Sequence, residues 1–262
     1  MNSIESATLT FALIFGSASA GFILQKRLPS HHLSDQSKGA AHLGAGLIAT
    51  LAALILGLLV SSTKGSYDQT ESLVNEIAAS FEHADRLLAN YGPEAIPLRG
   101  LLRQSLETAY SLVWPEENGL GKNPMLNDPS TSRMVLESVY NGVSLLKPSN
   151  SNQQQLQTDS IHLIDDIIQK RWLLQEIVYG GGISSILLVI PVLFVAFITF
   201  VYALYAPRNT TVVAAMLSSS ICIAVSIFLI SELASPLQGA LKISSKPVHV
   251  ALKIWANNDH FE

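Results

Sequence analysis

Four apolar stretches of the chain contain no Asp, Glu, Lys or Arg, and they limit its fold more than any other feature. They are residues 8–24, 41–61, 183–206 and 210–231. A bilayer core needs about 20 apolar residues as helix, and in lipid a segment must satisfy its backbone hydrogen bonds internally. The sequence therefore predicts an all-α integral membrane protein with four transmembrane helices in two pairs, and it excludes a purely soluble chain.

The first stretch has an alternative interpretation as a secretory signal. Ala18, Ser19 and Ala20 resemble the small-residue cleavage site of a signal peptide. The segment before them carries Glu5 and no Lys or Arg, whereas such signals begin with basic residues. Lys26 and Arg27 follow the stretch directly, where they would anchor a membrane helix. The uncleaved span is favoured, and removal of residues 1–20 stays open.

The charged residues are few and unevenly placed. They make up 14% of the chain, against roughly a quarter in ordinary soluble domains. Residues 67–179 hold 15 acidic and 8 basic side chains, and the rest of the chain holds 5 acidic and 8 basic ones. An acidic region without a basic stripe argues against a nucleic-acid partner.

The polar region between the two apolar pairs reads as helical. Leu73, Ile77 and Phe81 recur at helical spacing, and Tyr91-Gly92-Pro93 is a helix stop. No proline separates the second span from this region, so one unbroken helix can continue from the membrane into it. The soluble helices are expected at residues 68–90, 94–113, 130–146 and 155–179.

This pattern predicts four parts. They are a first transmembrane pair at residues 1–66, a soluble domain of about four helices at 67–180, a second pair at 181–232, and a tail at 233–262. The tail is expected to hold a short amphipathic helix that lies on the membrane interface or on the soluble domain. Gly180, Gly181 and Gly182 form a candidate hinge, because each glycine weakens a helix by about 1 kcal/mol relative to alanine.

Basic residues near the span ends give the orientation. Six lie on the side of the soluble region and four on the other. The first group is Lys64, Lys170, Arg171, Lys242, Lys246 and Lys253, and the second is Lys26, Arg27, Lys38 and Arg208. This bias favours the cytoplasm for the soluble domain and both termini.

The second span has one face of small residues. This face carries Gly46, Ala49, Ala53, Gly57 and Ser61 together with His42, and Thr50 lies beside it. Small residues let membrane helices approach closely, and a narrow conduit also favours small and hydroxyl side chains. Packing is the favoured interpretation of this face, with the first span as its partner, and a pore wall is the alternative.

The spans carry no ionisable side chain at mid-membrane depth, which argues against proton pumps and ion-coupled transporters. Glu232, at the end of the fourth span, is the nearest acid. It is either a solvated helix end or an ion-contact or inter-helix residue, with Arg208 or Lys242 as its partner. No catalytic motif is present, so we expect no enzyme activity, no metal site and no cofactor.

Four stretches give the chain a resemblance to the bestrophin-like domain family of mostly bacterial membrane proteins. The first stretch is residues 56–62 with Lys64, Ser66, Tyr67 and Asp68. The second is residues 91–95 with Pro97 and Arg99, and the third is residues 206–209. The fourth is Glu232 and Leu233 with Pro236, Gly239, Ile243, Ser244, Ser245 and Pro247. An acidic residue is usual between Leu233 and Pro236 in the family, where this chain has Ala234 and Ser235.

The resemblance implies a fold and a function. Bestrophins are pentameric anion channels with two membrane helices, a helical cytosolic region and two more membrane helices. Their second membrane helix lines the pore, which would place Leu51, Leu54 and Leu58, or Gly46, Ala53 and Gly57, along a conduit here. The chain has no acidic run like the calcium clasp of animal bestrophins, so calcium gating is not implied.

The function expected from the sequence is therefore an oligomeric passive ion channel in the bacterial inner membrane. Its partners would be the lipid bilayer, further copies of the chain (five by analogy) and inorganic anions. The alternative is a membrane-anchored helical module for interaction or sensing that does not conduct. Ion flux and a recovered partner distinguish the two.

Overall fold

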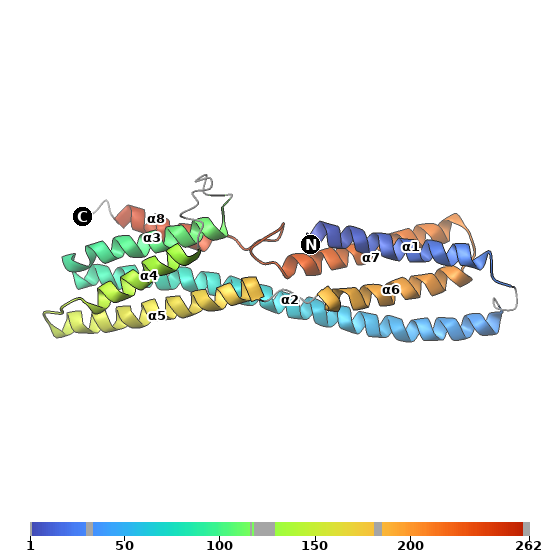
Figure 1. The fold of residues 1–262 in the computed structure, drawn as a ribbon, viewed down its shortest axis with the longest axis horizontal. Helices are drawn as coiled ribbons and strands as arrows, with labels where there is room; N and C mark the ends of the chain where they lie inside the picture. Colours follow the sequence, from blue (N-terminus) through green and yellow to red (C-terminus); the bar gives the residue numbers. More distant parts are fainter. Residues whose placement is uncertain (1, 30–33, 116, 118–128, 181–184, 259–262) are drawn as a thin grey trace. The chain divides into compact units, whose positions relative to one another are not determined.

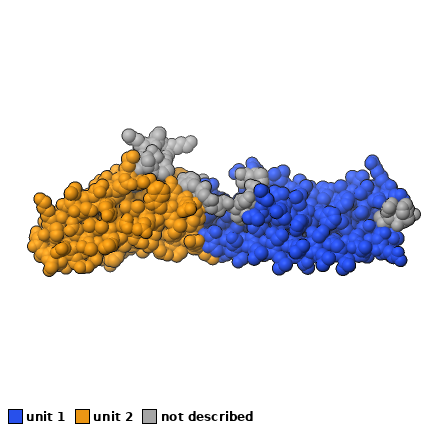
Figure 2. Space-filling model, turned by 60° about the horizontal axis from the view of Figure 1, so that its bottom comes forward, with its two compact units in different colours: residues 1–67, 181–242 blue, residues 68–180, 243–262 orange. Residues whose placement is uncertain are grey.

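The computed structural model describes residues 2–29, 34–115, 117, 129–180 and 185–258. This part of the chain is helical and forms two compact units (Figures 1 and 2). Unit 1 comprises residues 1–67 and 181–242, and unit 2 comprises residues 68–180 and 243–262. The all-α class and the four candidate membrane spans predicted from the sequence are confirmed.

The helices have the following bounds. They are α1 (Ser3–Gln25), α2 (Asp35–Tyr91), the 3-10 turn η2 (Pro93–Ala95), α3 (Ile96–Val113), α4 (Pro129–Ser144), α5 (Ser151–Gly180), α6 (Ser185–Tyr205), α7 (Thr210–Leu233) and α8 (Lys246–Asn258). Helix α2 runs unbroken for 57 residues, as the absence of a proline predicted, so the second span and the first soluble helix are one element. The residue after the end of α2 is Gly92, with a φ of 129°. Glycine is the residue that adopts such a positive φ most easily.

Unit 1 is held together by the four membrane helices. In this unit α1 packs against α6 and α7, as Figure 1 shows. Leu59 of α2 packs with Val192 of α6 and with Ile227 and Ile230 of α7 in a buried cluster. Asn209 caps α7, because its side-chain oxygen accepts a hydrogen bond from the Val212 N–H at 2.9 Å.

The buried stripe of α1 consists mostly of small residues. Its buried residues are Ser6, Thr10, Ile14, Ala18 and Gly21. A Cβ at Gly21 would lie 2.6 Å from the Phe200 carbonyl oxygen, so only glycine permits this approach of α1 to α6. A methyl group on Gly16, in contrast, would meet no atom within 4 Å, so Gly16 takes no part in this contact.

Unit 2 buries a core of large apolar side chains from α2, α3, α4 and α5. Fully buried members include Phe81, Leu88, Leu102, Leu106, Leu136, Val139, Ile164 and Ile167. The C-terminal helix α8 belongs to this unit and packs on α3, burying Val248, Ala251 and Trp255. The short amphipathic helix of the tail was expected on the membrane interface or on the soluble domain, and in the structure it lies on the helices of the soluble domain.

Candidate functional site

The α2 residues proposed to line a pore are mostly exposed in the single chain. Thr50, Leu51, Ala53, Leu54, Gly57, Leu58 and Ser61 are exposed, and Gly46 is half-buried. The buried face of this half of α2 carries Ala45, Ala52, Leu59 and Thr63 instead. Packing inside the chain therefore uses a different face of α2 from the one that carries the pore candidates.

The two pore-candidate glycines of α2 make no close contact that would explain them as packing residues. A methyl group on Gly46 or Gly57 would meet no atom within 4 Å among the residues described. The interpretation of this face as a packing surface for the first span is therefore wrong at these positions, because α1 packs on α6 and α7. Among the residues that the structure describes, nothing covers the two glycines, so this face is available to a conduit, to lipid or to a second copy.

Glu232 lies in a backbone cradle rather than at a solvated helix end. Its side chain is 4% exposed, and its Oε2 accepts hydrogen bonds from the N–H groups of Ala240 at 2.6 Å and Leu241 at 3.1 Å. The solvated interpretation is wrong, because the chain turns back at Gly239 and points two amides at the carboxylate.

Gly239 makes this cradle sterically possible. Its φ is 87°, and a Cβ at this position would lie 2.5 Å from Glu232 Oε2. Both the left-handed backbone and the close approach exclude a side chain there. The motif residues Glu232 and Gly239 are therefore two halves of one structural feature at the end of α7.

Arg208 does not pair with Glu232. Arg208 precedes α7, whereas Glu232 lies in its last turn, about 33 Å from Thr210 for a helix rising 1.5 Å per residue. The Arg208 guanidinium instead donates to Gln25 Oε1 at 2.8 Å and to the Phe22 carbonyl oxygen at 3.0 Å. It ties the turn between α6 and α7 to the end of α1. Lys242 is the last residue of the unit 1 segment that contains the cradle.

The candidate hinge can be followed only at its first residue. Gly180 ends α5, and Gly181 and Gly182 lie outside the described residues. The hinge therefore stays a proposal.

Two polar contacts in unit 2 were not expected from the sequence. Asp85 of α2 and Arg99 of α3 form a largely buried ion pair. Arg99 is one of the residues that carry the family resemblance, but nothing in the sequence spacing identified Asp85 as its partner. The other contact joins Tyr110 of α3 to His249 of α8, with 2.6 Å between the hydroxyl and Nε2.

The Tyr110 network continues into the segment after α3. Glu117 Oε2 accepts hydrogen bonds from the Tyr110 hydroxyl at 3.3 Å and from the Ser245 hydroxyl. Trp114 Nε1 donates to the Ile243 carbonyl oxygen at 2.9 Å. These contacts fasten the C-terminal segment to α3. The partners in the Ser245–Glu117 and Trp114–Ile243 bonds lie more than 120 positions apart in sequence, beyond the reach of any local pattern.

Comparison with known proteins gives one family. The model of the bestrophin-like domain matches residues 12–248. No curated protein matches significantly. Among solved structures, two variants of a bacterial bestrophin homologue from Klebsiella pneumoniae each match with a TM-score of 0.62 and 11% identity, over 95% of this chain and 97–98% of theirs. A third variant matches with a TM-score of 0.60 and 12% identity, over 98% of this chain and 97% of its own.

Proposed function

The chain belongs to the bestrophin-like domain family, and we propose that it is the subunit of an oligomeric passive channel for inorganic anions. The matched solved structures share its fold at 11–12% identity. Conduction and its selectivity are therefore inferred for this chain from its family and from its own residues.

The observation that carries the proposal is the exposed face of α2. Leu51, Leu54 and Leu58 are 52%, 64% and 71% exposed, although α2 packs against α6 and α7 at Leu59. Thr50, Gly57 and Ser61 lie on the same helix and are exposed too. Several copies of such a face around an axis would enclose a conduit with apolar constrictions and small or hydroxyl positions, and such surfaces can gate and select without ionised side chains.

Charge distribution supports anions as the permeant species. Outside residues 67–179 the chain holds 8 basic and 5 acidic side chains. Lys38, Lys64 and Arg208 lie near the ends of the membrane helices. Basic residues repeated around a ring raise the local concentration of anions at the mouths of a conduit. We place the channel in the bacterial inner membrane, with the soluble unit and both termini in the cytoplasm.

Flux from liposomes tests the proposal. Purified protein in vesicles with chloride or potassium gradients should pass chloride in clear preference to potassium. Leu54→Trp and Gly57→Trp should abolish this flux, since each indole would fill a narrow conduit. Leu193→Trp is the matched control, because Leu193 is 51% exposed on α6, outside the proposed pore face.

Two outcomes would contradict the proposal. One is the absence of flux for either ion from folded, inserted protein, which would favour the non-conducting interaction module. The other is a stable monomer by native mass spectrometry, because one copy of α2 cannot enclose a conduit.

A further inference from the structure

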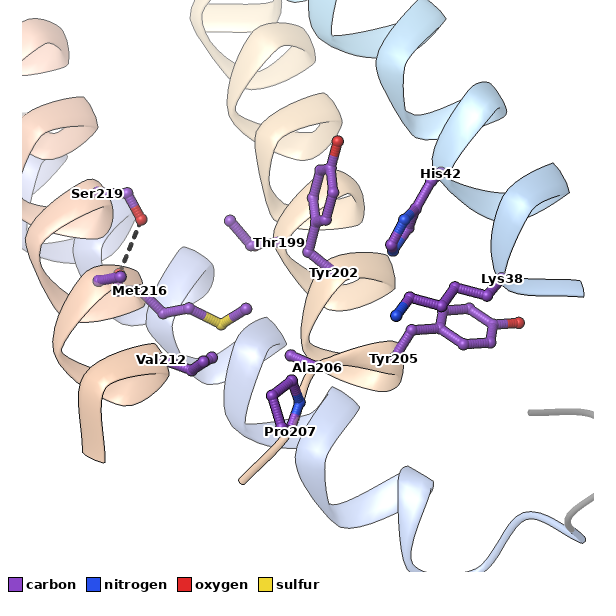
Figure 3. A pocket seen from close by; sticks show the side chains of 11 residues that line it. Lys38, His42, Thr199, Tyr202, Tyr205, Ala206, Pro207, Val212, Met216 and Ser219 are labelled. Carbon is purple, nitrogen blue, oxygen red and sulfur yellow. Dashed lines mark hydrogen bonds between the residues drawn. The ribbon is translucent and has the colours of Figure 1, made fainter. Parts of the chain in front are cut away.

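A cavity of about 520 Å³ lies in unit 1 between α2, α6 and α7 (Figure 3). Its walls include Lys38 and His42 of α2, Tyr202 and Tyr205 of α6, and Val212 and Met216 of α7. Its volume falls within the range of about 300–1,000 Å³ that is usual for small-molecule sites. The cavity lies at the end of the membrane helices that carries the turn from Ala206 to Asn209.

The two wall residues from α2 give the cavity a basic side. Lys38 and His42 are one helical turn apart, so they share a face of the helix. Figure 3 shows both side chains directed from α2 toward α6. Among the described residues that line the cavity none is acidic, and Asp35, on the first turn of α2, is not part of its wall.

His42 has an unused hydrogen-bonding atom in this wall. Its imidazole lies tilted against the Tyr202 ring at a centroid distance of 4.9 Å and meets the Tyr205 ring edge-on at 5.9 Å. Its Nε2 is buried and has no hydrogen-bond partner among the residues described. A buried polar nitrogen without a partner is costly, and with a proton on Nε2 the imidazole would donate to an acceptor that enters the cavity.

Two aliphatic hydroxyl groups on the other walls already donate hydrogen bonds within their own helices. Thr199 donates to the Val195 carbonyl oxygen at 3.0 Å, and Ser219 donates to that of Met216 at 3.0 Å. The remaining surface there is apolar, from Ala206, Pro207 and Val212. The cavity thus combines one side that favours an anionic acceptor with another that favours hydrocarbon.

We propose that this cavity binds an anionic phospholipid, with the phosphodiester against Lys38 and His42 and an acyl chain along the apolar wall. Basic pockets between membrane helices suit anionic headgroups, and tyrosines such as Tyr202 and Tyr205 are typical of the headgroup level. A soluble phosphate would satisfy the basic side but leave the apolar wall empty. The site does not depend on whether the protein conducts.

Native mass spectrometry of the oligomer in detergent tests this site. Dioleoylphosphatidylglycerol should remain bound in preference to dioleoylphosphatidylcholine. Lys38→Gln should weaken binding of the anionic lipid about fivefold, since each basic residue contributes about 1 kcal/mol. The double variant Lys38→Gln with His42→Gln should weaken this binding further. Lys38→Arg should retain the preference. The matched control is Lys26→Gln, because Lys26 follows α1 and is not in the cavity wall.

A thermal-stability assay separates the two sources of phosphate. Phosphatidylglycerol should raise Tm, whereas glycerol phosphate at the same concentration should not. Equal effects of the two would overturn the lipid assignment, because the apolar wall would then contribute nothing. Equal retention of the two lipids, a preference unchanged in the double variant, or no lipid retained by the oligomer would each overturn the site.

Discussion

The carboxylate of Asp85 on α2 receives two parallel hydrogen bonds from the guanidinium of Arg99 on α3. The Nε–Oδ1 distance is 2.8 Å and the Nη2–Oδ2 distance is 3.2 Å. The two side chains are 9% and 13% exposed. Such a fork-to-fork pair fixes the angle between two helices as well as their distance, so it sets how α3 returns along α2 after the turn at Gly92.

Breaking this pair should destabilise unit 2. Asp85→Ala leaves the Arg99 guanidinium buried without its carboxylate, which we expect to lower the free energy of unfolding by about 3 kcal/mol. Denaturant unfolding followed by circular dichroism in detergent measures the change. Glu82→Ala is the control, because it removes the exposed pair with Arg86 and should cost less than about 1 kcal/mol. Equal effects of the two substitutions would contradict this account.

Gly239→Ala should disrupt the Glu232 cradle. A methyl group at φ 87° would meet the carboxylate at 2.5 Å, so we expect a loss of about 2 kcal/mol or more. This corresponds to a fall in Tm of about 4–8 °C for a chain of this size. Gly65→Ala is the control, since Gly65 is helical with open space around it and alanine favours helix. A neutral Gly239→Ala would show that the turn can rearrange freely.

Trp114→Phe should loosen the attachment of α8. The substitution keeps an aromatic ring but removes the bond from Nε1 to the Ile243 carbonyl oxygen, at a cost of about 1–3 kcal/mol. Hydrogen exchange should accelerate in α8 more than in α4. Trp172→Phe provides the comparison, because Trp172 is 49% exposed and its ring stacks with Arg133. Unchanged hydrogen exchange in α8 would mean that the other contacts of this segment are enough to hold α8 on α3.

Stability should fall in alkaline solution partly through Tyr110. Burial raises the pKa of its hydroxyl above 10.0, the Ser245 hydrogen bond lowers it, and the negative charge of Glu117 raises it. Because the folded pKa exceeds the unfolded one, this contribution is complete below pH 10.0 and is lost as pH rises through the folded value. The stability advantage of wild type over Tyr110→Phe should therefore shrink above pH 10.0. Unfolding curves across this range measure it, with Tyr140→Phe as control, and a constant difference would contradict it.

Water accessibility should distinguish the proposed pore face from lipid-facing positions. In a Cys222→Ser background, needed because Cys222 is exposed, Leu54→Cys should react with a charged, membrane-impermeant thiol reagent. Leu193→Cys should react at least about tenfold more slowly, because thiolate formation requires water. Mass spectrometry of the labelled protein gives both rates. Equal protection of the two cysteines would place Leu54 in lipid or in a contact between copies.

The local elements of this protein follow from its sequence. Uncharged stretches of bilayer length predicted α1, α6, α7 and the first part of α2, because hydrocarbon permits no other backbone arrangement for an isolated span. The lack of a proline after residue 61 predicted that α2 would continue. Gly92 and Pro93 marked its end, because a left-handed φ and a missing N–H stop a helix.

The choice among faces was not available from the sequence. Spacing alone favoured the Gly46 and Gly57 side of α2 as a packing surface, yet the chain packs through Ala45, Ala52 and Leu59. Apolar side chains occur on every side of a membrane helix, since lipid and protein interior favour similar residues. Periodicity therefore shows that a helix spans the bilayer, but not which of its faces meets another helix.

The sequence by itself determined the helices, their order and their relation to a membrane, because these depend on hydrophobicity and backbone hydrogen bonding within each segment. Only the tertiary structure decided that Glu232 is enclosed by the Gly239 turn, that Asp85 is the partner of Arg99, and that His42 faces a cavity. Each of these depends on groups that are distant along the chain or on a backbone turn, and local sequence patterns do not specify such contacts.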